Sequence, residues 1–143
     1  MNRYLFALVL LAGCSTPTLQ PVASAHVHKA PHGGALVEVG EESAHCELVW
    51  DAARGYLTLY VLDGECELPV RISQKKLLVQ CSGSTYPLKA VRSALTEETV
   101  GNSSQFEGEL APLRGRTSWQ GQLVRLEIQG RVFQNLALEV ARP

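Results

Sequence analysis

Residues 35–50 decide the fold, and they read ALVEVGEESAHCELVW. Two short runs of alternating apolar and polar residues flank a four-residue turn. Alternation with a period of two is typical of β-strands that bury one face. A turn of this length would pair Val37 with Cys46 and Glu38 with His45, so that apolar side chains share one face and polar ones the other. The stretch therefore predicts an antiparallel β-hairpin.

The same alternation recurs along the rest of the chain, in short runs separated by Gly, Asp, Ser and Pro. No segment shows a helical period over eleven residues or more, and no internal repeat or second domain boundary is evident. The pattern predicts an all-β fold, a single antiparallel β-sandwich of the immunoglobulin-like kind. Strands are expected at 35–39, 44–50, 56–62, 66–72, 75–81, 85–91, 105–110, 122–128 and 131–140. A loop or one helical turn is expected at 93–104, and a loop at 115–121.

The first residues have the pattern of a secretory signal peptide. One basic residue, Arg3, precedes an apolar run that is too short for a permanent membrane span, and small residues then precede Cys14. This ending resembles the lipobox of bacterial lipoproteins. The resemblance implies cleavage before Cys14 and a cysteine that carries acyl chains such as palmitate. The alternative is an ordinary signal peptide followed by an incidental cysteine.

A domain organisation follows from this interpretation. We expect a signal peptide at 1–13, a lipidated Cys14 with a flexible, histidine-containing tether over 14–31, and a β-sandwich domain over 32–143. The tether is rich in Pro, Ser, Thr, Gln and Ala and has no periodicity, which is typical of a flexible linker. Two or more acyl chains anchor a protein stably. By resemblance to the sorting rule of Gram-negative lipoproteins, Ser15 implies the outer membrane, with the domain facing the periplasm.

Charge and motifs exclude two function classes. The chain has 13 basic and 14 acidic side chains, and its formal net charge is −1. Because no basic patch is present, nucleic acid is not an expected partner. No Gly-x-Ser-x-Gly or His-Glu-x-x-His motif occurs, and the histidines have too few acidic neighbours for a catalytic constellation, so an enzyme is not expected.

Three cysteines remain beyond Cys14. Cys46, Cys66 and Cys81 all fall on inward positions of expected strands, and an oxidising compartment permits a disulfide. Cys66 and Cys81 lie on successive expected strands and are the candidate pair, which leaves one thiol free. The alternative is three small buried side chains without a bond.

All four histidines lie at or before the second strand. His26, His28 and His32 are on the leader, and His45 is on the strand. Imidazole is the commonest side-chain metal ligand, and mixed nitrogen and oxygen donors favour Cu(II), Zn(II) or Ni(II). Met1 is the sole methionine and leaves with the signal peptide, so a thioether copper site is not expected. The alternative is a polar leader that happens to contain histidines.

His45 has acidic neighbours on the expected outer face of its strand. Glu47 lies about 6.5 Å further along, a spacing that one metal ion can bridge. The simpler interpretation is a cross-strand contact between Glu38 and His45. Because His32 and its two glycines adjoin this strand, the sharper hypothesis is a composite metal site of His32, His45 and Glu47.

Four stretches are considered together: PHGG at 31–34, VEVG at 37–40, AHCEL at 44–48 and LTLYVLD at 57–63. They resemble a small family of bacterial envelope proteins with histidine-rich leaders and a "Pro-His-Gly-Gly" β-domain. Similar domains are attached to periplasmic adaptor subunits of heavy-metal efflux systems. The resemblance implies a metal-linked periplasmic role and the same candidate ligands, His32, His45 and Glu47. This chain lacks the helical hairpin that an adaptor needs, so it is not itself an adaptor.

These observations predict a membrane-anchored periplasmic lipoprotein that binds divalent copper or zinc for buffering, sensing or delivery. The alternative is a structural or interaction module that docks on an envelope or efflux complex without metal, for which Pro69 on an expected edge strand gives some support. The candidate metal ligands are His26, His28, His32, His45 and Glu47.

Overall fold

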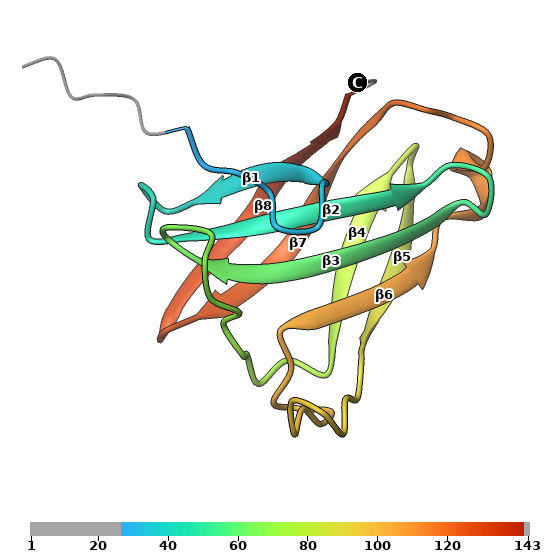
Figure 1. Cartoon of the computed structure of the whole chain (residues 1–143). Coiled ribbons are helices and arrows are strands. Elements are labelled where there is room, and N and C mark those ends of the chain that lie inside the picture. Colours follow the sequence, from blue (N-terminus) through green and yellow to red (C-terminus); the bar gives the residue numbers. More distant parts are fainter. Residues whose placement is uncertain (1–26, 142–143) are drawn as a thin grey trace, which may run out of the picture.

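The computed structural model describes residues 27–141, so the predicted signal peptide, Cys14 and His26 lie outside the described residues. Within that range, antiparallel strands form one sheet in the order β1-β2-β3-β6-β5-β4-β7-β8 (Figure 1). In chain order the elements are β1 (Ala35–Val39), β2 (Ala44–Asp51), β3 (Tyr56–Asp63), β4 (Lys76–Cys81), β5 (Ser84–Ala90), β6 (Gln105–Glu109), the 3-10 turn η1 (Ala111–Leu113), β7 (Trp119–Ile128) and β8 (Arg131–Val140).

The hairpin of β1 and β2 has the predicted register. Val37 lies opposite Cys46 and Glu38 opposite His45. The turn begins at Gly40, whose φ of 61° is a left-handed conformation that glycine adopts without steric cost. The hydroxyl of Ser43 closes the turn by donating to the Gly40 carbonyl at 2.7 Å.

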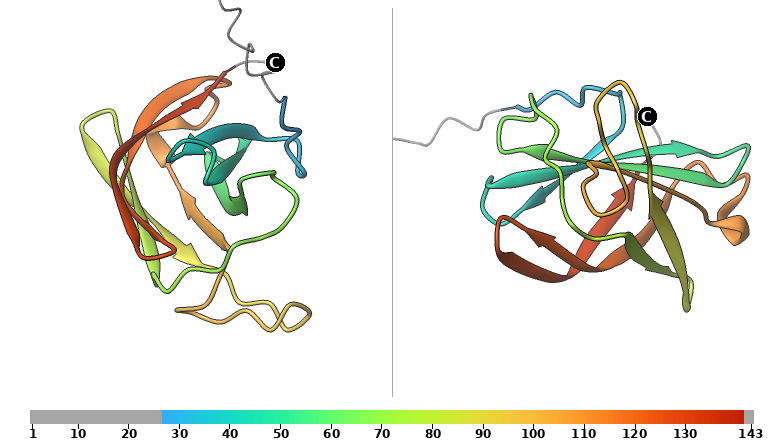
Figure 2. Two further views of the ribbon diagram at one scale, coloured as in Figure 1. Left: turned by 90° about the vertical axis from the view of Figure 1, so that its left-hand side faces the viewer. Right: turned by 90° about the horizontal axis from the view of Figure 1, so that it is seen from below.

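The sheet curls until its two ends, β1 and β8, pack beside each other (Figure 2). One half of the curled sheet then faces the other across a shared core. The all-β sandwich prediction is confirmed, in the form of one continuous, nearly barrel-shaped sheet. Among residues 27–141, no helix is long and apolar enough to cross a membrane.

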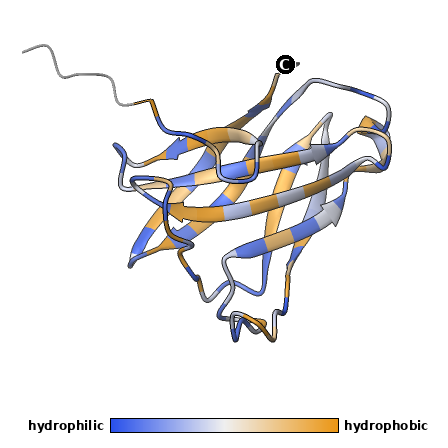
Figure 3. Cartoon of the chain, viewed as in Figure 1, coloured by the Kyte–Doolittle hydropathy of each residue, from blue (hydrophilic) through white to orange (hydrophobic). Residues whose placement is uncertain are grey.

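Alternate strand residues point into this core, and Figure 3 shows hydrophobic and hydrophilic residues interleaved along the strands. Burial of each large apolar side chain stabilises the fold by roughly 1.5–3 kcal/mol. All of these residues lie within 27–141, so a chain that begins at residue 15 keeps the whole core. The largest fully buried apolar side chains are Leu48, Leu57, Leu59, Leu77, Leu88, Phe106, Leu110, Leu113, Leu123, Leu126 and Leu138.

The prediction of a strand at 66–72 was wrong. This segment makes only isolated bridges, one of which joins Pro69 to Leu62. The side chain of Asp63 accepts hydrogen bonds from two of the following backbone N–H groups, at 2.8 and 3.1 Å, and so curls the chain into a turn. Cys66 lies in this turn with a φ of 59°.

The predicted Cys66–Cys81 disulfide is not formed either. Cys46, Cys66 and Cys81 are all buried, free thiols among the described residues. The pairing assumed that Cys66 and Cys81 lie on neighbouring strands. Because Cys66 is in a turn, and β4 has β5 and β7 as its neighbours, that premise fails.

The loop predicted at 115–121 ends earlier than expected. β7 begins at Trp119, which lies opposite Val140 at the end of β8. The ring of Trp119 packs edge-on against Trp50, with ring centres 5.6 Å apart. Through this contact the first residue of β7 packs against β2.

Residues 93–104 form a loop, as expected, and Glu98 holds it in place. The Glu98 carboxylate accepts the Ser104 backbone N–H at 2.9 Å, the Ser104 hydroxyl at 2.5 Å and the Thr96 hydroxyl at 3.2 Å. Burial raises the pKa of Glu98, but these hydrogen bonds and the nearby Arg71 outweigh burial, so the net pKa is lowered.

Replacing Glu98 by glutamine should lower the free energy of unfolding by about 1–2 kcal/mol at pH 7. A carboxyl group with a lowered folded-state pKa stabilises the fold above its ordinary pKa, and this contribution is lost as the pH falls through the folded-state pKa. The difference between the two proteins should therefore shrink below about pH 4. Urea denaturation of residues 15–143 at pH 7 and pH 3 measures it, with the exposed Glu97→Gln as control. A difference in unfolding free energy between the two proteins that is the same at pH 7 and pH 3 would contradict this account.

Candidate functional site

β2 is buried on both of its faces over residues 44–48. Cys46 and Leu48 point into the main core, whereas His45 and Glu47 point outward. The outward side chains are nevertheless only 4% and 0% exposed. Something must therefore cover the outer face of β2.

Two segments provide this cover. The first is the leader strap, which we define as residues 28–34, and which contacts β2 and β3 (Figure 1). The second is the turn that follows Asp63 at the end of β3. Together with side chains of β2 and β3 they form what we call the outer-face cluster: His28, His32, His45, Glu47, Tyr60, Leu62 and Cys66.

Glu47 fastens the leader strap to the sheet. Its Oε1 accepts the backbone N–H groups of His32 at 2.8 Å and of Gly34 at 2.9 Å. Its Oε2 lies 2.7 Å from the Nδ1 atom of His32. The His32 ring also stacks on Tyr60, with ring centres 3.8 Å apart and planes inclined by 7°. Both oxygens of this fully buried carboxylate are thus occupied.

The Pro-His-Gly-Gly segment has a physical explanation in this arrangement. Gly33 turns the chain with a φ of 74° and donates its N–H to the Ala30 carbonyl at 3.2 Å. Gly34 passes so close to β2 that a Cβ atom there would lie 2.5 Å from the Leu48 carbonyl oxygen. Only glycine fits at that contact, and the two glycines bring His32 onto Glu47.

His28 and His45 form a second pair beside this clamp. Their ring centres are 4.8 Å apart and their planes are inclined by 54°. The Nε2 atom of His28 is buried and has no hydrogen-bond partner. The Nδ1 atom of His45 lies 3.4 Å from the Asp63 carbonyl oxygen, a long contact. The tautomer that donates Nδ1–H to this oxygen leaves its Nε2 lone pair free.

The spacing of this pair suits a shared metal ion. With metal–nitrogen bonds of about 2.0–2.1 Å, two imidazole ring centres on one tetrahedral ion lie roughly 5 Å apart. Metal-bound histidines also commonly donate their other ring N–H to a backbone carbonyl, as His45 can to Asp63. The chemistry that the pair offers is therefore two imidazole nitrogen donors, one from the leader and one from β2.

The composite site of His32, His45 and Glu47 is not formed. Within residues 27–141, no three His, Cys, Asp or Glu side chains are grouped so that they could hold a metal ion. Both carboxylate oxygens of Glu47 form hydrogen bonds with the leader strap, and the His45 ring lies beside the ring of His28 and not that of His32. Glu38 does lie opposite His45, as the simpler interpretation expects, but its carboxylate accepts the Glu42 backbone N–H at 3.0 Å, and in the described part of the chain no hydrogen bond or ion pair joins it to His45.

Three members of the outer-face cluster were missed from the sequence. Tyr60 and Leu62 lie opposite Glu47 and His45 on β3, a register that the short turn after β2 could have suggested. Cys66 carried no signal, because its position depends on the turn that Asp63 imposes. Burial raises the pKa of Tyr60, and the carboxylates of Glu107 and Glu47 add to this effect.

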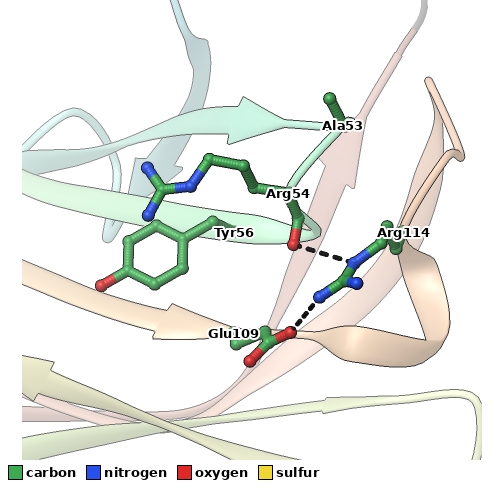
Figure 4. A pocket seen from close by; sticks show the side chains of 5 residues that line it. All are labelled: Ala53, Arg54, Tyr56, Glu109 and Arg114. Carbon is green, nitrogen blue, oxygen red and sulfur yellow. Dashed lines mark hydrogen bonds and ion pairs between the residues drawn. The ribbon is translucent and has the colours of Figure 1, made fainter.

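A separate hollow of about 400 Å³ lies at the other end of β2 and β3 (Figure 4). The Arg54 guanidinium stacks 4.7 Å above the centre of the Tyr56 ring. Arg114 donates to Glu109 at 2.5 Å and to the Arg54 carbonyl at 3.3 Å. The charged side chains that line the hollow thus have partners within the protein, and the hollow is an ordinary surface feature.

No family model, curated protein or solved structure matches this chain. The outer-face cluster is therefore the feature of the molecule that indicates a function.

Proposed function

We propose that this chain is a membrane-anchored periplasmic lipoprotein that binds one divalent copper or zinc ion through His28 and His45. The observation that carries the proposal is the buried, unpartnered Nε2 atom of His28, in a ring centred 4.8 Å from that of His45. A buried polar atom without a partner costs about 1–3 kcal/mol, and a metal bond removes that cost.

The two halves of the cluster have different roles in this proposal. His28 and His45 are ligands, and His26, two residues before His28, supplies a further nitrogen. Glu47 and His32 are positioning residues, because their hydrogen bonds hold the leader strap so that His28 reaches His45. An ion bound there joins the leader to the folded domain, which suits a protein that buffers, senses or delivers metal close to its anchor.

The second candidate is an interaction module that docks on an envelope or efflux complex without metal. Its support is that the Glu47 clamp is complete with protein groups alone, so the fold needs no ion. Crosslinking in intact cells separates the two proposals. One defined partner whose capture is indifferent to a chelator favours the second candidate.

Elemental analysis of the full chain purified from its native envelope tests the metal proposal. We expect about one copper or zinc per chain, removable by a chelator and restored on adding the ion back. A chain that is free of metal as purified and binds neither ion on titration would contradict it.

The anchor has its own test. Cys14→Ser in the full chain should move the protein from the membrane fraction to the soluble periplasmic fraction, because an acylated cysteine is the proposed attachment. Fractionation with an antibody to the β-domain measures the shift. Cys81→Ser should leave the protein in the membrane fraction, and membrane retention of the Cys14 variant would overturn the lipid anchor.

A further inference from the structure

Cys66 belongs to the outer-face cluster and not to the main core. Its side chain is 3% exposed, and neither it nor Leu62 is part of the hydrophobic cluster that fills the barrel. By contrast, Cys46 and Cys81 both point into that core. Among the three described cysteines, Cys66 is therefore the one that shares a face with the histidines.

One backbone oxygen ties Cys66 to His45. The Cys66 backbone N–H donates to the Asp63 carbonyl oxygen at 3.2 Å, and His45 Nδ1 lies 3.4 Å from the same atom. Burial raises the pKa of the Cys66 thiol, and the charges of Asp63 and Glu47 raise it further.

We propose that Cys66 is the third ligand of the ion that His28 and His45 bind. This inference rests on the proposed function and deepens it. As the structure stands, no three such side chains converge in the described part of the chain, so the turn after Asp63 has to shift to complete the site. Cys66 has a φ of 59°, a conformation that costs a non-glycine residue about 1–3 kcal/mol, and a shift of the turn can release that strain.

The bond changes are simple. The S–H bond breaks, the proton leaves to solvent, and the thiolate forms a bond to the ion with no change of oxidation state. Two imidazoles and one thiolate are a three-ligand set that suits tetrahedral Zn(II), with the fourth position open to water. A thiolate also favours zinc over harder ions such as Mg(II) or Mn(II).

Cobalt(II) is a suitable probe, because thiolate bonding to it gives a charge-transfer absorption band. Residues 15–143, reduced and free of metal, should develop this band on titration and reach its maximum at one Co(II) per chain. Cys66→Ser should abolish the band and weaken Zn(II) binding about tenfold or more. Cys81→Ser, which changes a core cysteine far from the histidines, should retain both.

A second measurement avoids any effect of the variant on folding. In the wild-type chain, Zn(II) should slow alkylation of Cys66 at least about tenfold, as followed by peptide mass, because a metal-bound sulfur is not free to react. Zinc should leave the slow labelling of Cys81 unchanged.

The outcomes separate the two claims. Zinc binding with no cobalt thiolate band, an unchanged affinity in Cys66→Ser and no protection from alkylation would overturn Cys66 as a ligand and leave the histidine pair. Failure of the wild-type chain to bind Zn(II), Co(II) or Cu(II) would overturn the proposed function and Cys66 with it.

Discussion

Replacing His28 and His45 together by alanine should weaken Zn(II) binding by residues 15–143 at least about 100-fold, which corresponds to about 2.8 kcal/mol. The reason is that the double variant removes both nitrogen donors of the proposed site, whose ring centres lie 4.8 Å apart. Isothermal titration with Zn(II) measures the change. Titration with Cu(II) should show a loss in the same direction.

The matched control is Glu38→Gln, which lies opposite His45 on β1 and is exposed. It should leave the affinity unchanged, because its side chain bonds to the Glu42 backbone and not to the histidines. Circular dichroism of the double variant establishes that the sheet is retained. A folded double variant that keeps the wild-type affinity would remove the histidine pair from the account.

Replacing Glu47 by alanine should lower the free energy of unfolding by about 2–4 kcal/mol, a larger loss than that expected for Glu98→Gln. The change removes the acceptor of two backbone N–H groups and of the His32 ring at a fully buried position. The leader strap should then detach and expose His45 to water. Urea denaturation gives the energy, and hydrogen exchange gives the location.

Hydrogen exchange is the more specific measurement, because it shows which backbone amides lose protection. Backbone amides of His32 and Gly34 should lose their protection in Glu47→Ala, whereas amides of β4 and β7 should change only with global stability. Glu47→Gln keeps the shape of the side chain and one carbonyl acceptor, so this variant should lose less stability than Glu47→Ala. Unchanged protection of the two strap amides in Glu47→Ala would show that the clamp does not hold the strap.

The central hairpin could be predicted because its determinants are local. A period of two over residues 35–50 and a four-residue turn fix which residues face each other, and the structure has that register. The expected strand at 66–72 failed although its alternation was equally regular. There the side chain of Asp63 captures the next backbone N–H groups, and Leu68, expected inside, is 64% exposed.

The candidate site was predictable only in part. Alternation correctly placed His45 and Glu47 on the outer face, but it also implied that the face is open to water. Whether such a face is covered depends on where a distant segment folds back, and no local pattern encodes that path. The partnership of His28 with His45, and of His32 with Glu47, depends on the turn at Gly33 and on the close packing of Gly34 against β2.

The most direct test of the account is nuclear magnetic resonance of the imidazole nitrogens of residues 15–143 during a Zn(II) titration. The ring signals of His28 and His45 should shift together and reach their limits at one zinc per chain, while the His32 ring keeps its bond to Glu47. Zinc-dependent shifts that are confined to His26 and His32, with His28 and His45 unaffected, would contradict the account.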